Sequence, residues 1–403
     1  MREIVEHYDA YPYPARDPED ERRRLVTGSP SWLPEVEHNL FGGRRDWSRP
    51  FRVLVAGGGT GDGLIQLAAL LDHDRRAAEI TYLDLSPAAR DIAERRAKMR
   101  GLSGIRFVTG DLLTAPDLGT FDYIDCCGVL HHLPEPQAGF DALAAALDPD
   151  GGIGLMVYAP YGRSGVYPLQ EAFRTLLSGL PPAERLAQAR RMLDRVPEGH
   201  PFRRNPHLSD HMAGDAGFYD LLLHAQDRAF RIDELAAMLE RAGLGLVAPA
   251  TPALYDLARL LPEGVAVPDG LSAVERMAAA ERLRGTIRTH VVYAAPAERA
   301  GSARASGRAM SLVPLLRDLD ASRLARQVAR TGRVTLEAGG AQVDEPVPAA
   351  AASLVAAIDG RRSLARIAEQ AGTDPMAFLG LWGRVNRVLA DWGLLHYCSP
   401  APR

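Results

Sequence analysis

The chain has 403 residues, of which 46% are hydrophobic and 24% charged, and its formal net charge is −4. This composition is that of an ordinary globular protein, and it excludes collagen, coiled-coil fibres and wholesale disorder. The near-neutral charge argues against a nucleic-acid partner, because proteins that bind a duplex usually carry a basic excess. Two of the three cysteines, Cys126 and Cys127, are adjacent, so we expect no disulfide framework and a cytoplasmic location.

Residues 1–50 are expected to form an N-terminal arm. The first residues, MREIVEHYDAYPYP, are polar and aromatic and lack the apolar core of a signal peptide, and no apolar run approaches the length of a membrane span. Tyr8, Tyr11 and Tyr13 alternate with prolines, which stiffen the backbone. Two interpretations stay open: the arm is a lid over an active site, or it packs on the domain surface.

From residue 51 onward, short β-rich runs alternate with helical stretches. This alternation predicts βαβ units, and therefore an α/β fold with a doubly wound, mostly parallel, Rossmann-like sheet. The predicted strands cover residues 51–59, 79–86, 105–111, 121–130 and 151–158, and the predicted helices cover residues 63–73, 88–101 and 140–150.

A helical stretch, residues 159–230, interrupts this pattern before a helix and two strands resume it. An insertion at this point falls near the carboxyl ends of the parallel strands, where such folds bind ligands. We interpret it as a substrate cap, with a purely structural helical layer as the alternative. The interrupted domain is predicted to span residues 51–295.

Residues 296–310 are mostly Ala, Gly, Ser and Arg, which is typical of a linker. Residues 311–403 then predict a small α+β domain with a hairpin, three helices and a closing strand. This order resembles a winged-helix module, and it looks like the small peptide-binding domains of peptide-modifying enzymes. Dimerisation as a homodimer, closure of the active site and docking of a peptide or protein are the roles open to it.

The strongest chemical signal is the glycine-rich turn VLVAGGGTGDG that follows the first predicted strand. Gly57, Gly59 and Gly61 let the backbone approach a ligand closely, and the next helix points its N-terminus at the same place. Such a loop holds either a dinucleotide pyrophosphate or the amino-acid end of S-adenosylmethionine. Alone, it does not separate these two ligands.

The ends of the next strands separate the two ligand classes. Asp84, at the end of the second strand, can accept hydrogen bonds from a ribose diol in either class. Asp111, after the third strand, can bind an adenine amino group while Leu112 packs on the ring. The stretch FDYIDCCGVLHHLPEP follows at the fourth strand, and a dinucleotide oxidoreductase would not need these last two elements.

Together, these four ordered motifs resemble the class I S-adenosylmethionine-dependent methyltransferases. The resemblance implies that the glycines surround the methionine moiety, that Asp84 binds the ribose and that Asp111 frames the adenine. Family members usually carry an acidic residue two positions before the first glycine, whereas this chain has Val55, so loop or water contacts are expected instead. The implied cofactor-binding residues are Gly57, Gly58, Gly59, Gly61, Asp84, Leu85, Asp111, Leu112, Cys127 and Gly128.

The predicted function is transfer of the cofactor's methyl group, by in-line displacement, to an acceptor. The GVLHHLP stretch looks most like that of enzymes that modify small molecules, so a small-molecule acceptor is favoured, with a peptide or protein as the alternative. A non-catalytic sensor of the same ligand is the rival from another class. Candidate bases are His131, His132 and His224, since histidine accepts protons near neutrality. We predict no metal, because adjacent Cys or His pairs cannot converge on a tetrahedral ion.

Overall fold

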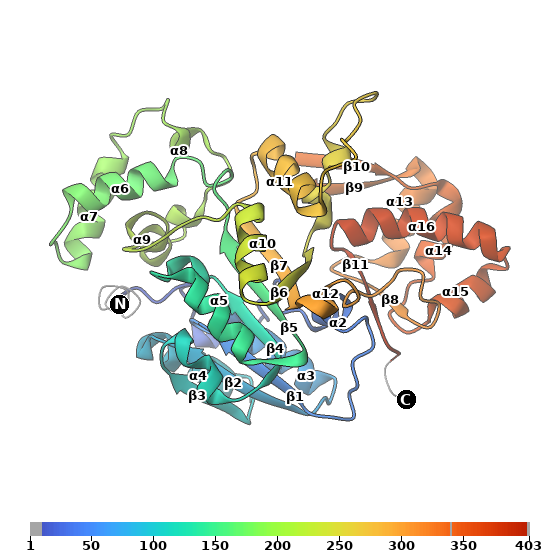
Figure 1. Ribbon diagram of the computed structural model, residues 1–403, viewed down its shortest axis with the longest axis horizontal. Helices are drawn as coiled ribbons and strands as arrows, with labels where there is room; N and C mark the ends of the chain where they lie inside the picture. Colours follow the sequence, from blue (N-terminus) through green and yellow to red (C-terminus); the bar gives the residue numbers. More distant parts are fainter. Residues whose placement is uncertain (1–9, 339–340, 401–403) are drawn as a thin grey trace.

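The computed structural model describes residues 10–338 and 341–400. Its centre is a seven-stranded sheet with the order β3-β2-β1-β4-β5-β7-β6 (Figure 1). The first five strands in the chain run parallel, and β7 pairs antiparallel with both β5 and β6. The predicted doubly wound, mostly parallel sheet is therefore confirmed. Its strands are β1 (Phe51–Ala56), β2 (Ala78–Asp84), β3 (Ile105–Thr109), β4 (Phe121–Cys127), β5 (Leu147–Tyr158), β6 (Leu244–Pro249) and β7 (Thr289–Pro296).

Helices cover both faces of the sheet, which is why its strands are nearly continuous apolar runs. Alternate residues of β1 show the division: Val53 and Val55 belong to the core on one face, and Leu54 and Ala56 to the core on the other. The first face is covered by α2 (Leu33–Leu40), α3 (Asp62–His73) and α4 (Pro87–Met99), and the second by α5 (Pro136–Ala145), α10 (Ile232–Arg241) and α11 (Ala273–Arg284).

One predicted helix, residues 140–150, is displaced in the structure. Helix α5 begins at Pro136, where the fixed φ angle of proline suits the first helical turn, and it ends at Ala145. The chain then enters β5 at once, because Leu147 pairs with Phe121 at the start of β4. Residues 147–150 are therefore strand rather than helix.

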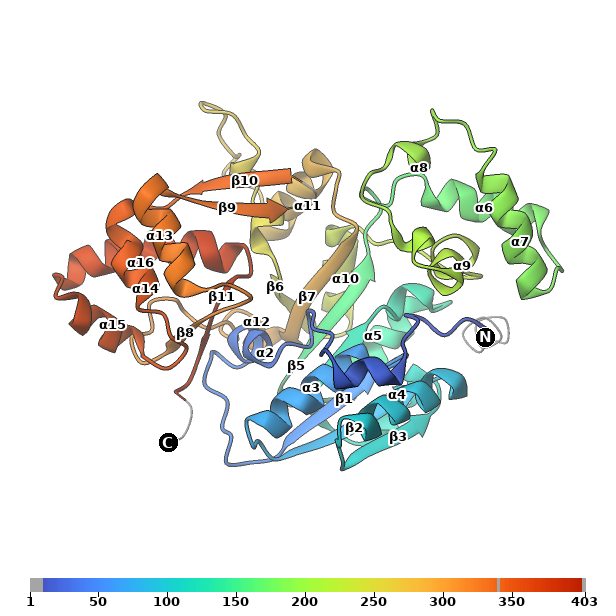
Figure 2. The same cartoon turned by 180° about the vertical axis from the view of Figure 1, so that it is seen from behind.

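The insertion forms a helical lobe above one end of the sheet, well separated from the C-terminal unit (Figures 1 and 2). It has its own hydrophobic core, built by residues such as Phe173, Leu186, Phe218 and Leu222. Its helices are α6 (Val166–Leu176), α7 (Pro182–Leu193), α8 (Pro201–Arg204) and α9 (Asp215–Leu223).

The C-terminal unit has a separate core around Phe378 and Trp382. The predicted hairpin, helices and closing strand are all present, apart from residues 339–340, which lie outside the described residues. Two elements precede the hairpin: β8, which pairs antiparallel with β11, and α13, which the sequence presents only as a basic stretch. The elements are β8 (Val313–Leu316), α13 (Ala321–Thr331), β9 (Arg333–Ala338), β10 (Ala341–Pro346), α14 (Ala352–Ala356), α15 (Leu364–Ala371), α16 (Pro375–Asp391) and β11 (Leu395–Cys398).

The connection between the two units is packed on the first one. It includes the short helix α12 (Ala297–Ala300), and the backbone N–H of Ala305 donates to the carbonyl of His38 in α2 at 2.7 Å. The small side chains of Ala303 and Ala305 are buried there, so the backbone can approach α2 closely. The composition typical of a linker therefore belongs to a closely packed segment.

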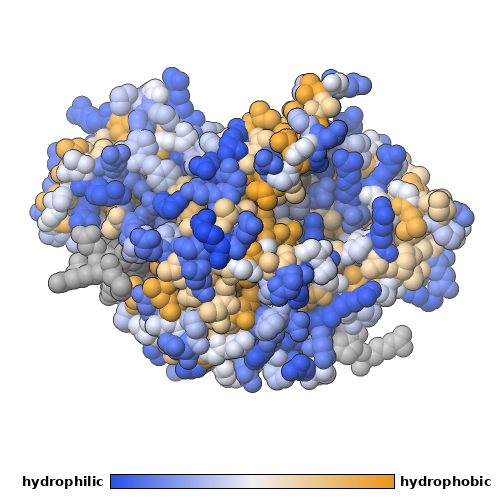
Figure 3. All heavy atoms as spheres, viewed as in Figure 1, coloured by the Kyte–Doolittle hydropathy of each residue, from blue (hydrophilic) through white to orange (hydrophobic). Residues whose placement is uncertain are grey.

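The surface is mixed rather than uniformly polar. Figure 3 shows hydrophilic residues over most of the visible face, with hydrophobic residues gathered near its centre, between the helical lobe and the C-terminal unit. Across the described residues, no helix combines the length and apolar content that a bilayer crossing requires.

Candidate functional site

A cavity of about 640 Å³ lies at the carboxyl ends of the parallel strands. Its wall comes from the ends of β1 to β5 and the loops that follow them, from the N-terminal arm, and from α9 of the helical lobe. Every predicted cofactor residue except Gly61 lines it, as does one of the three candidate bases, His132. The cavity therefore joins the predicted cofactor site to one predicted base.

The glycine loop is built so that no side chain fills this part of the cavity. A Cβ atom on Gly57 would lie 2.2 Å from the side chain of Val129, and one on Gly58 would lie 2.4 Å from the ring of Tyr82. Both distances are far below van der Waals contact, so these positions require glycine. Gly61 has a different structural role. Its φ angle of 100° turns the chain into α3, and it packs against Ala93 rather than lining the cavity.

Asp84 is held rigidly at the end of β2. One carboxylate oxygen accepts a hydrogen bond from the N–H of Gly59 at 2.7 Å, and the other accepts from the N–H of Ser86 at 2.8 Å. Each carboxylate oxygen can accept a second hydrogen bond, so the group can also receive a ligand's hydroxyls. The first contact ties the carboxylate to the glycine loop.

The order of the strands sets the order of the chemical groups along the cavity. Asp111 follows β3, Asp84 ends β2, the glycine loop follows β1, Cys127 ends β4 and Tyr158 ends β5. Since β3, β2, β1, β4 and β5 are successive neighbours, these groups form a row along the sheet edge. An elongated ligand can contact all of them.

His131 is separated from the cavity although it is adjacent to His132. It is fully buried, and its ring stacks on that of Tyr158 with 3.8 Å between centroids. Burial, aided by the nearby His132 and Arg163, holds the pKa of His131 well below its usual value. The ring is not among the residues that line the cavity, and its role as a base stays a prediction.

The backbone of Gln226 assigns opposite tautomers to His132 and His224. The Gln226 carbonyl lies 3.0 Å from Nδ1 of His132, so that nitrogen donates a proton and the lone pair of the neutral ring is on Nε2. The Gln226 N–H donates to Nδ1 of His224 at 3.1 Å, so that ring carries its proton on Nε2. The two rings stack with 3.8 Å between centroids.

Asp220 is a carboxylate close to both rings. It lies in α9, is buried in the cavity wall and accepts a hydrogen bond from the hydroxyl of Tyr158 at 3.0 Å. Burial raises the pKa of Asp220, whereas the neighbouring His132 lowers it. The candidate ligand atoms of His132, His224 and Asp220 lie within 4.8 Å of one another, but the lone pair of His224 is already engaged by Gln226. The arrangement therefore suits proton transfer better than metal binding.

The N-terminal arm forms part of the cavity wall through Tyr13, and Tyr11 stacks on Tyr219 of the lobe. Tyr8, the third tyrosine of the predicted lid, lies outside the described residues. The carbonyl of Pro14 accepts a hydrogen bond from the side chain of Thr60, directly after the glycines, at 2.7 Å. The arm thus contacts both the glycine loop and the lobe.

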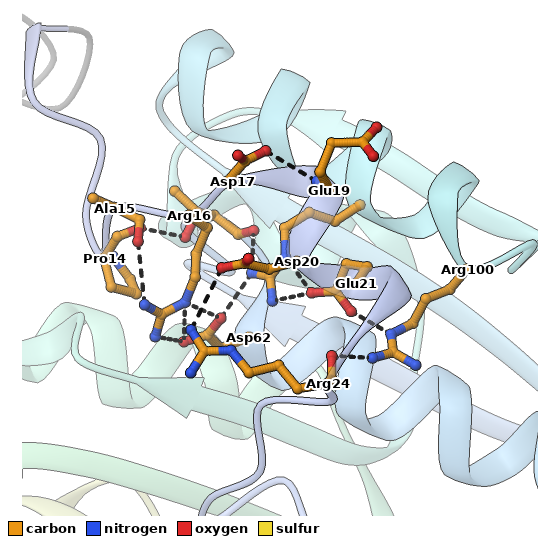
Figure 4. Close-up of polar contacts among 12 residues, drawn as sticks. Pro14, Ala15, Arg16, Asp17, Glu19, Asp20, Glu21, Arg24, Asp62 and Arg100 are labelled. Carbon is orange, nitrogen blue, oxygen red and sulfur yellow. Dashed lines mark hydrogen bonds and ion pairs between the residues drawn. The ribbon is translucent and has the colours of Figure 1, made fainter.

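An ion-pair network anchors the arm (Figure 4). Arg16 pairs with Asp62 at the start of α3 at 2.6 Å, and Asp62 also pairs with the buried Arg96 at 2.7 Å. Glu21 of the arm bridges Arg96 and Arg100 of α4. Because Arg96 and Glu21 are almost completely buried, their charges satisfy each other rather than being screened by water.

Among the cavity-wall residues that sequence reasoning missed are four with polar side chains: Ser31, Asp125, Tyr158 and Asp220. Ser31 and Asp220 come from segments with no recognisable motif. Asp125 lies within a strand that reads as buried, and Tyr158 ends another. The alternation along β4, with Ile124 and Cys126 in the core of one face, was the available signal that Asp125 faces the other way.

Comparison with known proteins gives consistent matches for the first unit. Residues 54–153 match the family model described as a methyltransferase domain. An uncharacterized protein of Synechococcus is 32% identical over 250 residues, covering 59% of this chain and 57% of that protein. A ubiquinone/menaquinone biosynthesis C-methyltransferase of Methylobacterium nodulans is 27% identical over 202 residues, covering 50% of this chain and 68% of that enzyme.

One solved structure shares the fold of nearly the whole chain. PKMT2 from Rickettsia typhi, in complex with AdoHcy, aligns over 93% of this chain and 77% of its own, with a TM-score of 0.63. The sequence identity is 14%, so this likeness concerns the fold. The alignment extends beyond the matched domain to the helical lobe and the C-terminal unit.

Proposed function

Because residues 54–153 form a class I methyltransferase domain whose cofactor is S-adenosylmethionine, we propose that this chain transfers the cofactor's methyl group to a small-molecule acceptor. One observation carries the proposal: a single cavity connects the cofactor residues at β1, β2 and β3 to His132 and Asp220. Its volume of about 640 Å³ lies within the range of small-molecule sites.

The residues present fit the cofactor. Asp84 would accept hydrogen bonds from the ribose hydroxyls, Asp111 would bind the adenine edge, and Leu112 would pack on the ring. Gly57, Gly58 and Gly59 line the cavity without side chains, which would leave room for the methionine moiety beside their backbone. When bound, the cofactor supplies a methyl group on a sulfonium, which an acceptor nucleophile takes by in-line displacement.

The protein's own chemistry is then positioning, exclusion of water and removal of one proton. The arm and the lobe enclose the cavity, and a low-water site favours a step in which charge is neutralised. His132 accepts the acceptor's proton at Nε2, because Gln226 keeps the other ring proton on Nδ1. Asp220 stabilises the imidazolium that results.

The composition of the wall favours a small acceptor over a peptide or protein docked by the C-terminal unit. All the described residues that line the cavity precede residue 221, so the described part of residues 311–403 contributes none of them. The acceptor end is formed instead by Tyr13, Tyr158 and Asp220, from the arm, the sheet and the lobe. A docked macromolecule would have to displace the anchored arm.

Calorimetric titration with S-adenosylhomocysteine tests the cofactor site. We expect one site per chain in the wild type and at least about tenfold weaker binding in Asp84→Ala, since charge-assisted hydrogen bonds to the ribose are lost. Asp122→Ala is the matched control, because this β4 carboxylate pairs with Arg45 and Arg52 outside the cavity. Absence of binding to the wild type, or equal binding to Asp84→Ala, would overturn the proposal.

A further inference from the structure

Asp125 is a buried carboxylate in the cavity wall with no basic partner. It is 2% exposed and lies in β4, in register with Val55 of β1. The hydroxyl of Ser31 donates a hydrogen bond to its Oδ2 atom. Among the described residues, no arginine, lysine or histidine forms an ion pair with Asp125. An isolated ionised carboxylate is costly to bury, so this site is suited to a cation supplied by a ligand.

The other buried or half-buried carboxylates of the wall are already matched. Asp62 pairs with two arginines, Asp84 accepts two backbone N–H groups, and the half-buried Asp111 accepts the N–H of Leu113. The buried Asp220 accepts the Tyr158 hydroxyl and lies beside His132. Of the two buried carboxylates of this wall, Asp125 is therefore the one whose charge is less compensated by the protein.

Its position lies next to the glycine loop. A Cβ on Gly63, in the first turn of α3, would be 3.2 Å from Oδ2 of Asp125 and 2.7 Å from the hydroxyl of Ser31. Because β1 and β4 are adjacent, Asp125 lies on the α3 side of the sheet at the same level as Val55, two residues before Gly57. This is the region that the methionine moiety occupies if the cofactor binds as proposed.

We propose that Asp125, oriented by Ser31, binds the ammonium group of the cofactor's methionine moiety. The carboxylate thus comes from β4 rather than from β1, where Val55 cannot supply it. This assignment rests on the proposed function, since it concerns how the same cavity holds the same cofactor. The assignment also explains the position of Ser31. Its hydroxyl donates to one carboxylate oxygen of Asp125, and the other oxygen can accept from the ligand.

The test compares two ligands that differ in the amino-acid portion, which carries the ammonium group. S-adenosylhomocysteine carries the complete amino acid, whereas 5′-methylthioadenosine keeps the adenine, ribose and sulfur but lacks it. In Asp125→Asn, we expect S-adenosylhomocysteine to bind about tenfold or more weakly, and 5′-methylthioadenosine to bind as in the wild type. Ser31→Ala is the matched control: it retains the carboxylate and should keep most of the discrimination between the ligands.

Equal effects of Asp125→Asn on both ligands, or no effect on either, would overturn the assignment. If wild-type protein bound neither ligand, the proposed function itself would fail, so the two failures are distinguishable. Thermal unfolding of the variant shows whether it is folded.

If the variant does not fold, a measurement on the wild type tests whether Asp125 binds the ammonium group. Burial raises the pKa of Asp125 to about 6, while the Ser31 hydrogen bond lowers it. The titratable groups around it include Tyr123, Cys126 and Cys127 of its own strand and Tyr293 of β7, whose pKa values are all raised, so they stay neutral near pH 6. Two carboxylates lie beyond them: Asp62 of α3, whose pKa is lowered by its arginine partners, and Glu35 of α2, whose pKa is raised by burial and which pairs with Arg317. The affinity ratio of the two ligands should rise between about pH 5 and 7, and a constant ratio would contradict the assignment.

Discussion

Replacement of His132 by alanine tests the base and its tautomer. The Gln226 carbonyl, 3.0 Å from Nδ1, directs the lone pair of the ring to Nε2, and this lone pair is what the variant loses. A positioned general base contributes about 10²–10⁴ in rate, which is about 3–5 kcal/mol, so we expect kcat to fall by that factor. The affinity for S-adenosylhomocysteine should stay within about twofold, because Asp84 and Asp111 are untouched.

The assay is turnover of an accepted small molecule, followed by release of S-adenosylhomocysteine, with and without added imidazole. The ring removed from His132 lies between those of His131 and His224, so the variant leaves a space of imidazole shape. We expect added imidazole to restore part of the lost rate. An unchanged kcat in the variant would refute the base role, and a lost rate that imidazole cannot restore would indicate a packing role instead.

Two further predictions concern the arm and the junction with the C-terminal unit. Arg16→Ala removes the pair with Asp62, so the arm should open more often; we expect faster dissociation of S-adenosylhomocysteine in stopped-flow measurements, and an unchanged rate would show that the arm is no cover. His396 is buried, and its pKa is lowered to about 3, mainly by desolvation and then by Arg317 and Arg304. The unfolded chain therefore takes up a proton on this ring near pH 6.5, whereas the folded chain does not. The folded state loses stability as the pH falls below about 6.5. Urea denaturation measures the free energy of unfolding at pH 7 and at pH 5. Between these pH values, the wild type should lose about 2 kcal/mol more than His396→Phe. Equal losses would contradict the lowered pKa of His396.

The parts of the site that follow strand ends could be predicted from the sequence. The glycine loop, Asp84 and Asp111 each come directly after a buried strand, and parallel strands bring their carboxyl ends to one edge of a sheet. The strand that precedes each of these groups therefore determines its position, and the order of the strands determines which groups lie next to it. The same reasoning predicted the sheet itself, because βαβ alternation leaves few arrangements.

The remaining parts depend on contacts between distant segments. Asp220 reaches His132 only because the helical lobe folds back over the strand ends, and Ser31 reaches Asp125 across 94 positions of sequence. The choice between His131 and His132 depends on the short 3-10 turn Leu130–His132, which buries one ring and leaves the other in the cavity wall. No periodicity in the sequence encodes these contacts.

The packing of the C-terminal unit was also beyond sequence reasoning. Arg317 pairs with the buried Glu35 at 2.6 Å, and the N–H of Tyr397 donates to His38 at 3.2 Å. Deleting residues 311–403 would therefore expose the buried face of α2, and loss of activity after deletion would not separate docking from folding. Point substitutions on the surface of this unit are the better test of a docking role.

We propose that the chain transfers a methyl group to a small molecule held in the cavity. The most direct measurement is mass spectrometry of the intact chain incubated with S-adenosylmethionine labelled in its methyl group, against separate pools of small metabolites and of peptides. We expect labelled products in the metabolite pool, formed by the wild type and greatly reduced in His132→Ala. Labelled products confined to the peptide pool, or labelling that His132→Ala leaves unchanged, would contradict it.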